Sequence, residues 1–277
     1  MTQRAGRRLT SLILGLVCLA AATGAHAKSQ LLTGTIILGV PRSDFVVVGA
    51  DRLWTNALAK PGDPPWERQG PQRKIALHPS LPLAIATAGL ATLDAEQDTV
   101  SYIRELITPL DVSRLDLDTI VELLRPHLHE KILALRDSAR RALAANPADA
   151  DAKIRLQAAR QTLLIAYVTA GRASLGWVQV DDEWKAKRET PPHGAVAWPT
   201  SLDQFYRTGS FASTSKLFGY AITDRAGLVQ HVRHVIEAGI REEARLHQGQ
   251  NRQVGGPVDV VLVDAKGARC VPACPPP

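Results

Sequence analysis

The stretch TIILGVPRSDFVVVGAD, residues 35–51, decides the fold of this 277-residue chain. Its two runs rich in β-branched residues, 35–40 and 45–50, flank a segment at 41–44 whose composition is typical of a turn. Each run is apolar at nearly every position, which is the pattern of a strand buried on both faces. We therefore predict a β-hairpin in which both strands are buried.

The order of elements around this hairpin predicts the fold class. A loop rich in proline and charge at 56–72 precedes a second predicted hairpin, 74–77 and 83–87. Further along, the pattern predicts helices over 93–160 with a break at Asn146-Pro147, strands at 163–169 and 175–180, a proline-rich loop at 182–205, a helix around 228–240 and a buried strand at 258–263. Four strands before any helix exclude a parallel βαβ series. The order favours an α+β fold of two antiparallel sheets face to face with helices outside.

The N-terminal residues 1–27 predict an export signal. Three arginines precede an apolar run at 12–22, and AHA at 25–27 has the small-x-small pattern of a cleavage site. The apolar run is shorter than the ~20 residues that span a bilayer, which disfavours a membrane anchor. We expect a periplasmic or secreted protein with no anchor after signal cleavage.

Charge and cysteine usage limit the partners of the exported chain. Removing the three signal arginines lowers the formal net charge from +6 to +3, which is too mild to indicate a nucleic-acid partner. Cys270 and Cys274 then remain in the tail, residues 266–277. In an oxidising compartment they would pair as a disulfide, and two free thiols are the alternative.

Motifs for nucleotide and metal chemistry do not occur in the sequence. No GxGxxG, phosphate loop, GxSxG or HExxH pattern is present. His231, His234 and Glu237 share one side of the last predicted helix, yet this spacing is more typical of a solvated helix face than of a metal site. The five tryptophans are expected to pack rather than to bind a ligand. We predict no cofactor and no metal.

Four segments of the sequence together point to a known family. Gly34-Thr35 opens the first hairpin and Asp51 ends it; Lys74 stands in RKIALHP, followed by ATAGLA; YRTGS occupies 206–210; and GGPVDVVLVD occupies 255–264. Together these segments resemble the proteasome β-type threonine peptidases, which are N-terminal nucleophile hydrolases, and especially the bacterial proteasome-like peptidases. The resemblance covers most of residues 33–265.

This resemblance implies an architecture and a set of domain boundaries. The fold would be a four-layer αββα sandwich over residues 35–265, with a helical insertion at about 136–160. Residues 28–34 would be a propeptide after the signal peptide, and 266–277 a tail rich in cysteine and proline. Ring-shaped homo-oligomers are implied as well.

The resemblance also implies catalytic roles. After self-cleavage at Gly34, the Thr35 hydroxyl would be the nucleophile, and its own free α-amine the base. Lys74 would hold a positive charge beside Thr35, Asp51 would orient Lys74, and Ser210 would relay a proton. Backbone N–H groups in a turn from Ala86 to Gly89 would stabilise the oxyanion. The substrate would be a short peptide or an unfolded protein.

Other interpretations of these residues stay open. Thr35 is also an ordinary strand residue, Asp51 and Lys74 an ordinary surface ion pair, and Ser210 a turn or helix cap. Ala86 stands where the family usually has glycine, and Asn251 near a supporting aspartate, with Val254 in place of serine. These departures motivate a rival hypothesis, a catalytically inactive exported scaffold or binding protein of the same fold. A small-molecule amidase is the third hypothesis.

Overall fold

The predicted hairpin lies inside a five-stranded antiparallel sheet. The structure, a computed structural model, describes residues 32–33, 35–58, 73–93, 98–112, 115–189, 196–198, 217–247 and 254–272. β2 (Ile37–Pro41) pairs with β3 (Phe45–Asp51), and every residue of both strands is buried. The sheet order is β10-β2-β3-β11-β12, where β10 is Val196–Trp198, β11 is Val258–Asp264 and β12 is Gly267–Cys270. The predicted buried hairpin is therefore confirmed.

A second five-stranded antiparallel sheet contains the other predicted hairpin. Its order is β5-β6-β7-β8-β9, with β5 at Ile75–Leu77, β6 at Leu83–Gly89, β7 at Gln161–Thr169, β8 at Arg172–Val180 and β9 at Trp184–Glu189. Two short strands, β1 (Leu32–Thr33) and β4 (Thr55–Asn56), pair separately from both sheets.

The two sheets pack face to face. Alternate residues of a strand point to opposite faces, so every second residue of a central strand faces the other sheet. Val46, Val48 and Ala50 of β3 share one apolar cluster with residues of the second sheet. Many members of this cluster are small: Ala84, Ala86, Ala88, Ala166 and Ala173 all belong to it. The intervening β3 residues Phe45 and Val47 belong instead to a cluster on the other face of the first sheet. This alternation explains why both runs of the hairpin are apolar throughout.

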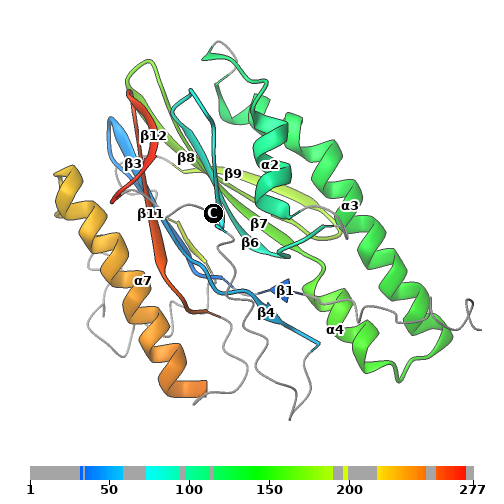
Figure 1. The fold of residues 1–277 in the computed structure, drawn as a ribbon. Coiled ribbons are helices and arrows are strands. Elements are labelled where there is room, and N and C mark those ends of the chain that lie inside the picture. The colour runs from blue at the N-terminus through cyan, green and yellow to red at the C-terminus, as the bar shows by residue number, and fades with distance from the viewer. Residues whose placement is uncertain are drawn as a thin grey trace, which may run out of the picture. The chain divides into compact units, whose positions relative to one another are not determined.

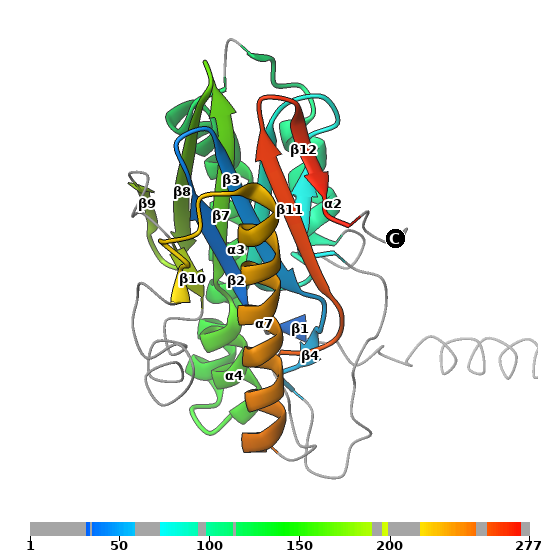
Figure 2. The same ribbon diagram turned by 90° about the vertical axis from the view of Figure 1, so that its left-hand side faces the viewer.

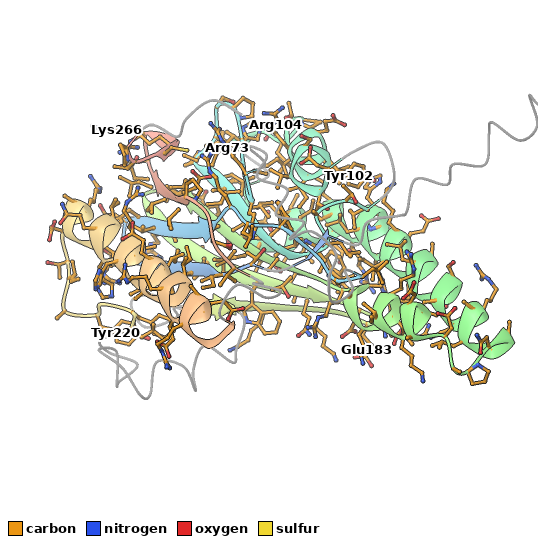
Figure 3. All side chains as sticks on the ribbon, turned by 60° about the horizontal axis from the view of Figure 1, so that its bottom comes forward. Arg73, Tyr102, Arg104, Glu183, Tyr220 and Lys266 are labelled. Atoms are coloured by element: carbon orange, nitrogen blue, oxygen red, sulfur yellow. The ribbon has the colours of Figure 1, made fainter. Side chains whose placement is uncertain are left out.

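Helices cover the outer faces of the sheets. α7 (Arg225–His247) packs on β2, β3 and β11 of the first sheet (Figures 1 and 2). α2 (Thr99–Ile107) and α3 (Leu117–Ala145) pack on the second sheet. Tyr102 of α2 and Tyr220, shortly before α7, consequently lie on opposite sides of the paired sheets (Figure 3). The fold is α+β, as the sequence predicts.

Local sequence sets the bounds of the helices. Asp98, Asp116 and Asp149 cap α2, α3 and α4 (Ala150–Ala158) by accepting a hydrogen bond from a backbone N–H in the first turn. α3 ends at Ala145, immediately before the predicted break at Asn146. The segment around 136–160 is helical as expected, because it comprises the end of α3 and the whole of α4. α4 packs along α3.

Two local predictions were wrong. The segment at 182–205, predicted to be a loop, contains β9 and β10. The tail, for which no element was predicted, contains β12. Ala86 and Gly89 lie in a strand, β6, rather than in a turn. The sequence WKAKRE of β9 lacks an apolar alternation because the strand forms a sheet edge, where residues 185–187 are exposed. Pairing with β8 rather than burial therefore defines it.

Among the described helices, none combines the length and apolar character needed to cross a membrane. The predicted signal peptide, residues 1–27, lies outside the described residues.

Candidate functional site

Asp51 is the centre of the candidate site. It is the last residue of β3 and is wholly buried. Its Oδ1 accepts hydrogen bonds from the Ile36 backbone N–H at 2.8 Å and from Lys74 Nζ at 2.9 Å. Its Oδ2 accepts from the backbone N–H groups of Gly255 at 2.9 Å and Leu53 at 3.2 Å. Because every one of these groups is a donor, the site is built for the carboxylate form.

Lys74 reaches Asp51 from the start of β5. Its side chain is wholly buried, and Nζ also donates to the Leu53 carbonyl oxygen. Its own carbonyl accepts from the Thr87 N–H at 2.8 Å, which fixes the Lys74 backbone against β6. The alternative of an ordinary surface ion pair is therefore wrong for Asp51 and Lys74, because burial removes both side chains from water.

Burial acts on both ionisable groups of the pair. Desolvation lowers the pKa of Lys74 to about 8, and the charge of Asp51 opposes this effect. Desolvation likewise raises the pKa of Asp51, against the charge of Lys74 and the hydrogen bonds from Gly255 and Ile36. A strongly shifted pKa is typical of catalytic sites, although buried structural ion pairs show such shifts as well.

Thr35 is connected to this pair through the next residue of the chain, Ile36. It precedes Ile36, whose N–H donates to the same Asp51 oxygen that accepts from Lys74 Nζ. Its side chain is 4% exposed. Three of the predicted site residues, Thr35, Asp51 and Lys74, are thus brought together from three different segments. Asp51 Oδ1 thus links the Lys74 ammonium to the backbone of the residue that follows Thr35.

A second buried ion pair supports the site. Arg52 donates to Asp259 of β11 through Nε at 2.8 Å and through Nη2 at 2.5 Å, and both side chains are buried. The Gly255 carbonyl accepts from the Leu53 N–H at 3.0 Å. These bonds fasten the two residues that follow Asp51 to β11 and to the segment just before it. Sequence reasoning missed this pair, whose one signal was the aspartate in the apolar run VDVVLV.

The predicted oxyanion residues occupy the ladder of the second sheet. Ala86 lies opposite Ile75 of β5 and Leu164 of β7. Because the Thr87 N–H donates toward β5, the alternation along a strand directs the Ala86 N–H toward β7. Gly89 ends β6 with φ of +127°, a conformation that glycine adopts readily. The catalytic role of these two N–H groups stays a prediction.

Several predicted residues lie outside the described part of the chain. These are Gly34, Ser210, Asn251 and Cys274. Val254 is described and belongs to the apolar cluster beneath α7. Cys270 is disulfide-bonded, which excludes a free thiol at this position.

The metal candidates on α7 have other contacts. His231 Nε2 lies 3.0 Å from the Leu217 carbonyl oxygen and the residue is partly buried, whereas His234 is exposed. Within the described ranges, no group of three or more His, Cys, Asp or Glu side chains is arranged to hold a metal ion.

Comparison with known proteins adds no relative: no protein-family model matches the chain, and no curated protein matches it significantly. The functional assignment therefore depends on the site and on the sequence resemblance.

Proposed function

We propose that this protein is an exported threonine peptidase of the proteasome-like type, which hydrolyses peptide amide bonds through Thr35 after self-cleavage at Gly34-Thr35. The observation that carries the proposal is the buried Lys74–Asp51 pair, with Nζ 2.9 Å from Oδ1. The same oxygen accepts from the N–H of Ile36, the residue that follows Thr35. A buried ion pair is a weak source of stability, because desolvation offsets much of the attraction. Stability alone therefore does not explain why the chain buries Lys74, whereas a catalytic role for this lysine would.

The self-cleavage step needs only groups of the chain and water. The Thr35 hydroxyl oxygen attacks the Gly34 carbonyl carbon and forms an ester as the carbon–nitrogen bond breaks. The hydroxyl proton passes to the departing nitrogen, which becomes the α-amine of Thr35. Water then hydrolyses the ester and releases the segment that ends at Gly34. Lys74 would favour loss of the hydroxyl proton through its positive charge.

Substrate hydrolysis follows the same chemistry with a peptide in place of the prosegment. The α-amine takes the hydroxyl proton as Thr35 attacks the substrate carbonyl, and it returns a proton to the leaving amine. Water hydrolyses the acyl-enzyme ester and restores the threonine. No metal or cofactor is required in these steps.

The segment before Thr35 gives further support. β1, which precedes Gly34, pairs antiparallel with β4, with Leu32 opposite Asn56 and Thr33 opposite Thr55. Release of the prosegment would free β4 to pair with another extended chain. Peptides commonly bind by adding a strand in this way, through backbone hydrogen bonds. An extended peptide is thus a better match to the site than a small rigid molecule.

The arrangement of layers is also consistent with the proposal. α7 on one sheet, the two paired sheets, and α2 with α3 on the other sheet would form the four-layer αββα sandwich of the N-terminal nucleophile hydrolases. Assembly into a homo-oligomeric ring is part of the proposal, as is export by residues 1–27.

Peptide hydrolysis by the exported protein tests the proposal. The wild type should release a chromophore from several acyl-peptide amides, and Thr35→Ala should lose this activity by at least about 10³-fold. Thr35→Ser, which keeps a hydroxyl group, should retain part of the activity. Hydrolysis should also decline as the pH rises through about 8, where Lys74 loses its proton. Full activity in Thr35→Ala would overturn the proposal.

The inactive scaffold remains the second candidate, favoured by the position of the Ala86 N–H within the β6–β7 ladder. It predicts no hydrolysis of any peptide and no difference between the wild type and Thr35→Ala. Activity on one small amide alone, with no peptide cleaved, would favour an amidase.

A further inference from the structure

The Trp54 side chain lies against the ammonium group of Lys74. The distance from Lys74 Nζ to the centroid of the Trp54 ring is 4.6 Å. Trp54 is 1% exposed and Lys74 is wholly buried. A cation over an aromatic face within about 6 Å is attracted by the ring quadrupole, most strongly where water is excluded. The ring therefore adds to the stabilisation of the charged lysine by Asp51 and the Leu53 carbonyl.

Core packing alone does not account for this tryptophan. Its Nε1–H is buried and has no hydrogen-bond partner among the described residues, although buried indole N–H groups usually find one. In the described core, Trp54 belongs to none of the three large apolar clusters and groups with Ala91 alone. The ring is thus held at a cost, in a place where its clearest favourable contact is the Lys74 ammonium.

We propose that Trp54 is a positioning residue for Lys74: its ring face holds the ammonium, in the charged form, against Asp51 and the Leu53 carbonyl. The catalytic meaning of this contact rests on the proposed function, whereas the contact itself does not. Leu53 and Trp54 are consecutive residues, so one short segment supplies both the carbonyl oxygen and the ring face that contact Nζ.

Few groups hold the charge on Lys74, so the ring contact should have a measurable effect on it. Within the described part of the chain, Asp51 is the charged residue that acts on Lys74. Because burial lowers the pKa of Lys74 to about 8, the lysine loses its charge just above neutral pH. A favourable ring contact counteracts this loss, and its removal should shift the balance toward the neutral amine.

The test is an NMR titration of the Lys74 side-chain ammonium in the exported chain, with Lys74→Met to assign its signal. Trp54→Leu should lower the pKa of Lys74 by about one unit, since a desolvated cation–π contact has an energy of that order. Trp54→Phe, which keeps a weaker ring face, should lower it by less. Trp184→Leu is the matched control. Trp184 also has a buried Nε1–H with no hydrogen-bond partner in the described part of the chain, but it lies on β9, so its replacement should leave the pKa of Lys74 unchanged.

An unchanged or raised pKa of Lys74 in Trp54→Leu would overturn the inference. Circular dichroism checks that each variant folds, and Trp54→Phe decides the question if Trp54→Leu does not. The titration needs no self-cleavage, so its outcome is separate from that of the proposed function. Where self-cleavage occurs, Trp54→Leu should also move the upper pH limit of cleavage down by about one unit, which loss of packing alone would not do.

Discussion

Replacing Asp51 by asparagine should destabilise the protein by about 3–5 kcal/mol, because it leaves a buried ammonium without its carboxylate. Lys74 itself accounts for only part of this magnitude. In the folded wild type the pKa of Lys74 is about 8, so the lysine can become neutral at pH 7 at a cost of about 1.4 kcal/mol, which limits its own share of the loss. The rest of the loss comes from the backbone N–H groups of Ile36, Leu53 and Gly255, which lose a charged acceptor. The new amide NH₂ would also face the Gly255 N–H, which donates to Oδ2 in the wild type.

A double-mutant cycle with Lys74→Met separates the pair from its surroundings. Urea denaturation at pH 7, followed by circular dichroism, gives the free energy of unfolding of the wild type, Asp51→Asn, Lys74→Met and the double variant. The double variant should be more stable than the sum of the single effects predicts, by at least about 2 kcal/mol. Asp182→Asn is the control: Asp182 pairs with Arg136 and Arg140 at the surface, so its replacement should change the midpoint little. Additive single effects, within about 0.5 kcal/mol, would refute the coupling inferred for Asp51 and Lys74.

Three further predictions follow from buried contacts. Arg52→Ala should cost about 3–5 kcal/mol in urea denaturation, because Asp259 is left buried without its cation, and a loss below 1 kcal/mol would contradict this. Gly49→Ala should cost about 1–3 kcal/mol, since the new Cβ would lie 2.5 Å from Ile236 Cδ1; adding Ile236→Val, which removes that atom, should recover part of the loss. The folded pKa of Lys74, about 8, lies below its ordinary 10.5, so the unfolded chain holds the proton more tightly between these values and stability should increase with pH there. Relative to Lys74→Met, the wild type should gain roughly 3 kcal/mol between pH 7 and pH 11, and no gain would contradict the burial of the ammonium.

The central part of the fold could be predicted from the sequence because its signals are local. The runs at 35–40 and 45–50 are apolar throughout, and in the structure β2 and β3 have neighbours on both faces. The helix break at Asn146 was equally visible, since proline follows it. By contrast, β9 has charged, exposed residues and exists because β8 offers a pairing edge, which its own composition does not reveal.

The site was predicted in its parts but not in its environment. Asp51 and Lys74 could be named from spacing and resemblance, yet Lys74 follows Arg73 in a charged segment, and nothing local shows that it is wholly buried. The contact between Arg52 and Asp259 joins residues 207 positions apart, so only the tertiary fold reveals it. Trp54 was expected simply to pack, and its contact with Lys74 likewise depends on the fold.

The most direct test of the account is the intact mass and N-terminal sequence of the exported protein, measured beside a Thr35→Ala variant. We predict that the wild-type chain begins at Thr35, whereas the variant keeps the residues before it and begins at Lys28. A wild-type chain that also begins at Lys28 would contradict the account, because Thr35 would then have no free α-amine with which to act.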